Sequence, residues 1–202
     1  FISCALFLCT ISLSAQTKMT AKEAALKIAD RILDSTTYEF KNTKTGEVYK
    51  SVKKLPLSMD VKVACKYNNW HYTNGVTNIA LMELADKVGD KKYDKYVLKN
   101  MNFVFNEGNL DFFRRQYDQA FKDGGWNAVR KLSWHMIFRG KRLDDNGPMG
   151  ASLIELQMRH PNEAFLSYVN ETADHLNYAE PRLVDGTIAR LWPHVNTIWA
   201  DD

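Results

Sequence analysis

A succession of helix-length apolar patterns, most of them closed by glycine, constrains the fold of this chain more than any other feature. The first begins at Thr20, where Glu23 completes a capping box, and its apolar residues keep helical spacing to Leu33. Comparable patterns cover residues 76–88, 93–104, 110–122, 126–138, 149–158 and 161–173. No alternation of the kind that marks a sheet of any size occurs between them. The sequence therefore predicts an all-α protein made of helical hairpins packed one after another.

Residues 35–69 interrupt this series with a stretch rich in Thr, Tyr, Lys and Gly. Thr45 and Gly46 predict a turn between two short extended pieces, residues 37–41 and 47–51. We expect a loop or a small hairpin here, and no linker between domains, because 202 residues correspond to about one domain.

The first 15 residues are apolar and uncharged, and they lead into the small and polar residues from Ser12 to Gln16. This pattern is typical of the hydrophobic region and cleavage site of a secretory signal peptide, here without its charged beginning. A buried N-terminal helix is the alternative. We expect residues 1–15 to be a signal peptide, so that the protein is exported to the periplasm or the extracellular space. Residues 16–202 are then expected to be the N-terminal part of a single domain.

Composition and motifs exclude several classes of function. The net charge of +3 is spread along the chain, which does not indicate a nucleic-acid partner. After the leader, no apolar run of about 20 residues remains to span a membrane. The histidines lack metal-binding spacing, and Cys65 has no partner once the leader is removed. Phosphate-binding glycine loops and nucleophile elbows are missing as well. We therefore expect no metal and no cofactor.

Two acidic clusters remain as candidates for chemistry. Asp144 and Asp145 occupy a turn with Gly and Pro ahead of the helix pattern at residue 149, and Asp201 and Asp202 end the sequence. Either cluster is also explained as an ordinary helix cap. Aromatic residues lie in or beside the expected loops, at Trp70, Tyr72, Trp192 and Trp199, with His71 and His194 next to them. Aromatic faces stack on sugar rings, and paired carboxylates are the usual groups that cleave glycosides. Together with export, these features favour a carbohydrate-active protein.

Three motifs in order resemble those of the unsaturated glycuronyl hydrolases. They are WHYTNGV at residues 70–76, RLDDNGPMG at 142–150, and the stretch from DGT to TIWADD at 185–202. The set is similar to glycoside hydrolase family 105, the unsaturated rhamnogalacturonyl hydrolases, which are related to family 88. The resemblance covers about residues 18–202 and implies an (α/α)6 toroid, six helical hairpins in a ring around a central active site. This sequence would hold about the first half of that ring, as part of a longer gene.

The resemblance also implies the reaction. Such enzymes remove a 4,5-unsaturated uronic acid from the non-reducing end of oligosaccharides that a lyase has produced, here of the pectin or rhamnogalacturonan type. Asp145 and Asp202 match the two essential aspartates, and Asp202 is expected to be the general acid and base. Asp145 is expected to orient the substrate or stabilise charge. The substrate-binding residues expected beside them are Trp70, Tyr72, Asp144, His194 and Trp199.

Two other interpretations stay open at this point. One is another α-toroid glycosidase or a helical polysaccharide lyase, which would create the conjugated double bond that the first interpretation consumes. The other is a non-catalytic helical carbohydrate-binding or scaffold protein, in which Asp145 and Asp202 would merely cap helices. Asn146 also departs from the Cys that follows the acidic pair in many relatives, which bears on the subgroup and so on the substrate. The oligomeric state has no signal in the sequence.

Overall fold

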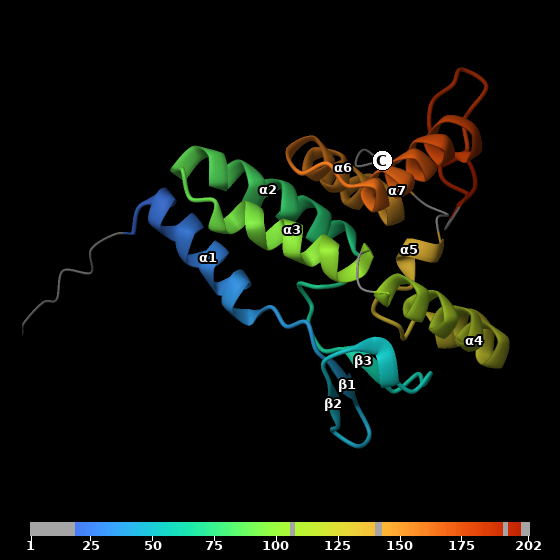
Figure 1. The fold of residues 1–202 in the computed structure, drawn as a ribbon. Helices are drawn as coiled ribbons and strands as arrows, with labels where there is room; N and C mark the ends of the chain where they lie inside the picture. The colour runs from blue at the N-terminus through green and yellow to red at the C-terminus, as the bar shows by residue number, and fades with distance from the viewer. Residues whose placement is uncertain (1–18, 106–107, 140–142, 192–193, 199–202) are drawn as a thin grey trace, which may run out of the picture.

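The structure is a computed structural model that describes residues 19–105, 108–139, 143–191 and 194–198 (Figure 1). Seven α-helices lie in these ranges: α1 Ala21–Ser35, α2 Tyr72–Val88, α3 Lys92–Phe105, α4 Asn109–Val129, α5 Met136–Arg139, α6 Leu143–Arg159 and α7 Glu163–Asp174. A π-helical turn, His175–Ala179, follows α7 directly. The expected all-α class is confirmed for the described part of the chain, where none of the helices is long and apolar enough to cross a membrane.

Several helix ends form as the sequence predicts. At the start of α1, the Glu23 carboxylate accepts from the Thr20 backbone N–H at 2.8 Å, and the Thr20 hydroxyl accepts from the Glu23 N–H at 3.2 Å. Gly89 ends α2 in the left-handed conformation, with φ of 71°. The Asp90 carboxylate then accepts from the first backbone N–H of α3 at 3.0 Å. Local side-chain chemistry therefore sets these boundaries.

The expected small hairpin is present, and it belongs to a three-stranded sheet. β1, Phe40–Asn42, pairs antiparallel with β2, Val48–Tyr49, across the turn that contains Gly46. Its other edge pairs with β3, Val61–Val63, which the sequence analysis did not predict. A strand of three residues is too short to show a recognisable alternation.

Two of the predicted helix boundaries are wrong. The pattern over residues 126–138 is not one helix: the backbone of α4 is non-helical at Gly124 and Gly125, a short helical stretch follows to Val129, and α5 has only four residues. Tight turns follow Val129 and bury both Leu132 and Trp134. In a continuing helix these two residues, two positions apart, would point to different faces and would not both be buried. The other error concerns α6, which begins at Leu143 instead of near residue 149. Pro148 lies inside α6, where a proline removes one backbone hydrogen bond and crowds the carbonyl four residues earlier, so the sequence favoured a later helix start than the structure shows.

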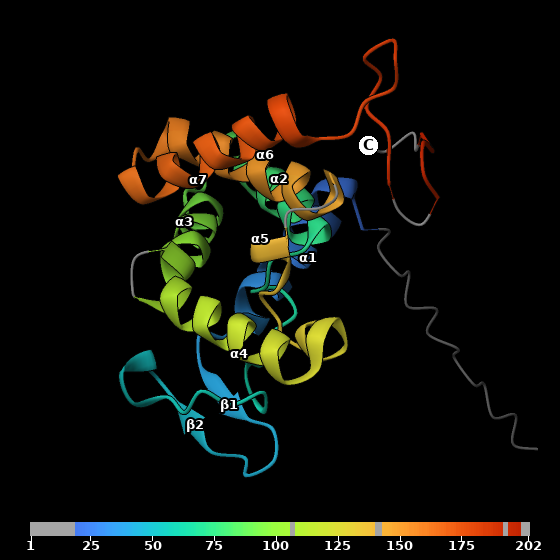
Figure 2. The same cartoon turned by 90° about the vertical axis from the view of Figure 1, so that its right-hand side faces the viewer.

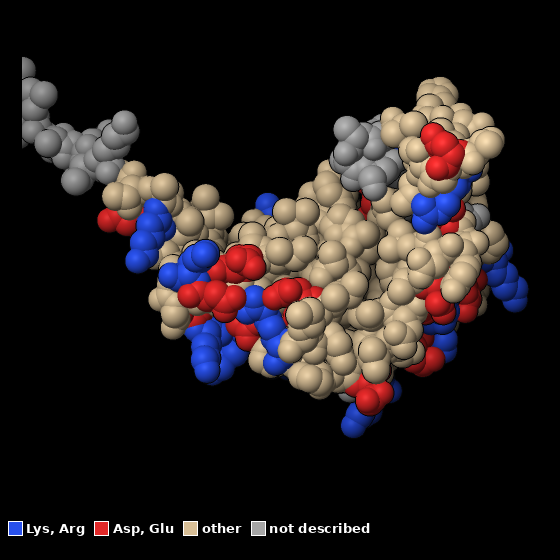
Figure 3. Space-filling model, turned by 90° about the horizontal axis from the view of Figure 1, so that it is seen from above, with Lys and Arg blue, Asp and Glu red and all other residues tan. Residues whose placement is uncertain are grey.

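The helices pack as hairpins. α2 and α3 form one pair and α6 and α7 another, and α2 lies along α6, which joins the two pairs (Figure 1). α1 packs on α3. Turning the molecule shows α4 between these hairpins and the small sheet (Figure 2). Lys, Arg, Asp and Glu side chains gather toward the edges of the face seen from above and leave its middle to other residues (Figure 3). One extended hydrophobic core connects the sheet to helices α2, α3, α4, α6 and α7.

Candidate active site

The first two motifs meet where α2 and α6 begin. Gly75, in the first turn of α2, lies against the backbone of Pro148 and Met149 in α6. A Cβ atom on Gly75 would lie under 3.0 Å from that backbone, so a residue with a side chain does not fit without a shift. Glycine therefore permits the two helices to approach at the ends that carry the motifs.

The first motif builds the start of α2. His71 is the N-cap, and its ring Nδ1 accepts from the Thr73 backbone N–H at 3.4 Å. The Tyr72 ring packs beside that of His71, with centroids 4.6 Å apart, and 46% of Tyr72 remains exposed. The buried Asn74 amide donates to the carbonyls of Lys66 and Asn69 at 3.0 and 3.2 Å and anchors the preceding loop. Tyr72 is thus presented at the helix start, where a ligand can reach it.

Trp70 requires a correction. The structure buries this residue, which is 1% exposed, instead of presenting it to a ligand. Its ring makes an edge contact with Tyr168 at 4.9 Å between centroids and lies 6.3 Å from the ring of Phe105. An indole that solvent does not reach stabilises the core below the site, and the expected contact between Trp70 and substrate is not supported. The sequence misled here because a Trp beside a polar helix start looks the same whether it points inward or outward.

Residues 143–150 of the second motif lie in the first turns of α6, and not in a loop before that helix as expected. The Asp144 side chain is 26% exposed, and its Oδ2 accepts from Arg190 Nη2 at 2.9 Å. Asn146 is buried, and its Oδ1 accepts from the Tyr168 hydroxyl at 3.3 Å. Asp145 stands between them in the helix, and its side chain lies outside the described part of the structure. Helix N-termini stabilise negative charge, which suits an acidic pair in this place.

Arg190 is a site residue that the sequence analysis missed. It is 6% exposed and lies on the segment after α7, which we call the arm and define as residues 180–191 and 194–198. Its backbone N–H donates to the Thr197 carbonyl at 2.8 Å, and its own carbonyl accepts from the Asn196 N–H at 2.9 Å. An arginine inside a long loop has no spacing that distinguishes it from a surface residue, so its pairing with Asp144 was not predictable.

The third motif begins in the arm with a tight turn. The Thr187 backbone N–H donates to the Asp185 carboxylate at 3.0 Å, and this bond holds the pKa of Asp185 below its usual value. His194 is exposed, and its carbonyl accepts from the Thr197 hydroxyl at 2.8 Å. Trp199 and Asp202 lie outside the described residues. Their expected positions beside Asp145 remain a prediction.

A cavity of about 140 Å³ opens next to Asn146. Its walls come from α4, α5, α6, α7 and the π-helical turn and combine charged, polar, aliphatic and aromatic side chains: Arg114, Ile137, Phe138, Asn146, Tyr168, Glu171, Thr172 and His175. The Arg114 guanidinium lies 4.1 Å from the centre of the Phe138 ring, and His175 Nε2 is 2.9 Å from Glu180 Oε2. Such a wall offers both hydrogen-bonding groups and an apolar ring, as small-molecule sites do.

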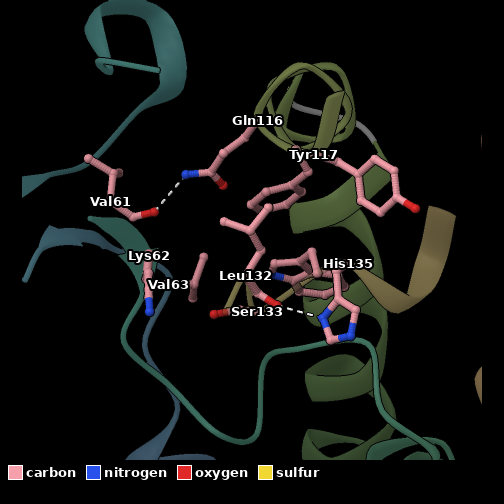
Figure 4. A pocket seen from close by; sticks show the side chains of 10 residues that line it. Val61, Lys62, Val63, Gln116, Tyr117, Leu132, Ser133 and His135 are labelled. Atoms are coloured by element: carbon pink, nitrogen blue, oxygen red, sulfur yellow. Dashed lines mark hydrogen bonds between the residues drawn. The ribbon is translucent and has the colours of Figure 1, made fainter. Parts of the chain in front are cut away.

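A second cavity, of about 10 Å³, lies between β3 and α4 (Figure 4). Gln116 closes one side by donating to the Val61 carbonyl at 2.9 Å, and His135 Nδ1 bonds to the Leu132 carbonyl at 2.7 Å on the other. The volume corresponds to about one water molecule, so this cavity is too small for a sugar. Among the residues that the structure describes, no cluster of three or more His, Cys, Asp or Glu side chains is arranged to hold a metal ion.

Helical hairpins packed side by side, with acidic and aromatic residues at the helix starts, are consistent with the all-α six-hairpin glycosidase fold. Residues 50–202 match the family model described as Glycosyl Hydrolase Family 88. The match includes all three motifs and covers most of the chain, which therefore belongs to glycosyl hydrolase family 88. It is a glycoside hydrolase of the unsaturated uronyl hydrolase type. None of the curated proteins compared with the chain gives a significant match.

Proposed function

We propose that this protein removes a 4,5-unsaturated uronic acid from the non-reducing end of lyase-generated oligosaccharides. The observation that carries the proposal is the meeting of parts of all three motifs. Gly75 of the first lies against Pro148 of the second, and Arg190, within the third, pairs with Asp144. Segments far apart in the sequence thus contribute to one region at the N-termini of α2 and α6, as a shared active site requires.

The proposed reaction is hydration of a vinyl ether. Asp202, protonated, donates a proton to carbon 4 of the unsaturated ring, and positive charge develops at carbon 5 and the ring oxygen. Water adds to carbon 5 and gives its proton to the Asp202 carboxylate, which restores the acid. The hemiketal at carbon 5 opens to a ketone, and the ring oxygen becomes a hydroxyl on carbon 1. Carbon 1 then releases the linked sugar as an alcohol and becomes an aldehyde.

Asp145 is assigned the second role, orienting the substrate or stabilising the charge that develops at carbon 5. Asp145 belongs to the first turn of α6, and the helix N-terminus next to it carries unpaired backbone N–H groups. Tyr72, exposed at the neighbouring start of α2, and His194, exposed on the arm, are proposed to contact the sugar. Trp199 is proposed to stack on the same sugar.

We propose a substrate of the rhamnogalacturonan type, because the three motifs are similar to those of family 105. The test is a panel of unsaturated disaccharides with the same uronate and different partner sugars, followed by loss of the absorbance of the conjugated double bond. Consumption of unsaturated galacturonyl-rhamnose in preference to unsaturated glucuronyl-hexosamine would support this specificity. Formation of that absorbance from an intact polysaccharide would instead identify a lyase.

We also propose that the protein is exported, as the apolar stretch of residues 1–15 predicts. Mass spectrometry of protein secreted from cells that carry the complete gene tests this. Processing near Ser14 or Ala15 is the expected result, whereas an intact N-terminus in the cytoplasm would contradict it.

A further inference from the structure

We propose that Arg190 is a positioning residue that attaches the arm to α6. The arm leads to Asp202, and α6 carries Asp145. The inference rests on the proposed function, in which both aspartates act on one substrate. It concerns a residue that does not itself touch the reacting atoms. Its role is to keep two distant parts of the chain in register.

The pairing of Arg190 with Asp144 is a built contact and not a surface ion pair. Arg190 Nη2 lies 2.9 Å from Asp144 Oδ2, and the side-chain exposures are 6% and 26%. A guanidinium removed from water in this way requires a charged partner in good geometry. The hydrogen bond is charge-assisted, so it is stronger than one between neutral groups, and the planar guanidinium gives it a defined direction.

The backbone of Arg190 extends this anchor toward the end of the chain. Two hydrogen bonds join Arg190 to Thr197 and Asn196, and Asn196 takes the left-handed conformation, with φ of 60°, that closes the loop between them. The Thr197 side chain then holds the His194 carbonyl. A displacement of Arg190 is therefore passed to residues 194–198, which include the first two residues of the TIWADD sequence that ends the third motif.

On the other side, Asp144 is tied to the catalytic assignment through α6. It is the immediate neighbour of Asp145 in the first turn of that helix, and the close approach of Gly75 and Pro148 holds the same turns against α2. The Asp144 carboxylate accepts from a guanidinium of its own chain. We therefore reassign Asp144 from substrate contact to positioning, together with Arg190.

The arm offers a matched control in Arg182. Its guanidinium donates to the carbonyls of Leu176 and Gly186, each at 3.0 Å, and so stabilises the start of the arm and its junction with the π-helical turn without bonding to Asp144. A variant at Arg182 loosens the arm locally. A variant at Arg190 separates the arm from α6. Comparing the two distinguishes register between the motifs from general stability of the arm.

The experiment measures kcat, KM and Tm for Arg190→Gln, Arg190→Lys, Asp144→Asn, the double variant Arg190→Gln/Asp144→Asn and Arg182→Gln, in the complete gene product, on the unsaturated disaccharide that it consumes. Misplacing a reacting group by about 1 Å costs about 100-fold, so Arg190→Gln is expected to lower kcat by that order with little change in KM. Asp144→Asn should cause a similar loss, and the double variant no more than either alone. Arg190→Lys should recover part of the rate, and Arg182→Gln should keep kcat close to that of the parent.

Several outcomes would overturn the inference. Folded Arg190→Gln with a parental kcat would show that the pair does not position anything. A rise in KM at constant kcat would assign the pair to substrate binding, and additive losses in the double variant would show that the two residues act independently. Should Arg190→Gln fail to fold, Asp144→Asn, which conserves volume at a partly exposed site, answers the same question.

A separate readout distinguishes failure of this inference from failure of the proposed function. Hydrogen exchange at the Arg190 and Asn196 amides does not depend on the substrate. These amides are expected to exchange faster than in the parent in Asp144→Asn and at the parental rate in Arg182→Gln. That result would show that Asp144 holds the arm even if the parent protein consumed no unsaturated sugar. Unchanged exchange in Asp144→Asn would refute the anchoring itself.

Discussion

Gly75 and Pro148 lie so close together that a Cβ atom on Gly75 would come under 3.0 Å from the Pro148 carbonyl group. The nearest atoms are backbone and not the end of a flexible side chain, so the contact has little freedom to relax. It lies one turn into α2 and near the beginning of α6, the two helix starts that carry the first two motifs. The close approach thereby sets the spacing between Tyr72 and the acidic pair.

Gly75→Ala is expected to lower the free energy of unfolding by about 1–3 kcal/mol, because the added methyl group must push two backbones apart. Urea denaturation followed by circular dichroism measures this loss. Gly147→Ala is the matched control, since its Cβ would meet Leu143 Cγ at an ordinary 3.5 Å within the same helix. That variant should be neutral or up to about 1 kcal/mol more stable. Equal stability of the two variants would contradict the steric account.

The sequence predicted most helices because their signals are local. The Thr20 capping box, the left-handed Gly89 and the Asp90 carboxylate act within a few residues and are found where expected. Boundaries failed where tertiary contacts decided them. The chain leaves the helical path after Val129 to bury Trp134, and β3 exists because β1 offers it a pairing edge.

The site was predictable only as a set of motifs. The resemblance of the motifs to the glycuronyl hydrolases indicated the importance of the segments around Tyr72 and Asp145, and the structure brings their helices into contact. The sequence did not reveal that Trp70 points into the core, because the burial of Trp70 depends on Tyr168 and other residues far away in the sequence. Nor did it reveal Arg190, whose role depends on a partner 46 positions earlier.

Asp202→Asn in the complete gene product is expected to abolish turnover and leave the fold intact, because the amide conserves volume but donates no acidic proton. Loss of a general acid costs about 100- to 10,000-fold. The adjacent Asp201→Asn is the control and should retain most of the rate. Asp145→Asn should lose most activity as well. For each variant, kcat is measured by loss of vinyl ether absorbance, and Tm is measured as a check of folding. A near-normal rate in Asp202→Asn, with loss of rate in Asp201→Asn, would assign the general acid to Asp201 instead.

Trp70 and Tyr72 should separate into a core residue and a ligand-binding residue. Trp70→Ala is expected to cost about 3–5 kcal/mol of stability, as truncation of buried aromatics does. Trp70→Phe, which is milder, should lower Tm but leave KM unchanged. Tyr72→Ala should instead raise KM and change Tm little, because nearly half of Tyr72 is exposed. A raised KM in Trp70→Phe at unchanged stability would restore the substrate contact that burial argues against.

Acid should destabilise the hairpin pair through Asp86. Arg159 donates to both Asp86 oxygens, at 3.1 and 2.8 Å, which joins the ends of α2 and α6 and lowers the pKa of Asp86. Because the folded pKa lies below the unfolded value of about 3.9, this stabilisation is present above that pH and is lost as the pH falls through the folded pKa. Asp86→Asn is expected to show a smaller acid-induced fall in Tm than the parent. Glu83→Gln, on the exposed surface of α2, is the control and should show the same acid-induced fall in Tm as the parent. A pH dependence of Tm in Asp86→Asn identical to that of the parent would rule out a contribution of Asp86 to acid destabilisation.

A polypeptide of residues 16–202 expressed alone should associate and be inactive on unsaturated disaccharides. Val76 on α2 and Ile154 and Met158 on α6 are large apolar side chains that remain exposed, and exposed apolar surface of this kind promotes association. The resemblance to the glycuronyl hydrolases also implies that groups binding the uronate carboxylate come largely from a later part of the ring. Size-exclusion chromatography with light scattering tests association, and Ile154→Lys/Met158→Glu should shift the polypeptide toward a monomer. A monodisperse parent polypeptide that consumes the vinyl ether absorbance would show instead that these 187 residues form a sufficient catalytic unit.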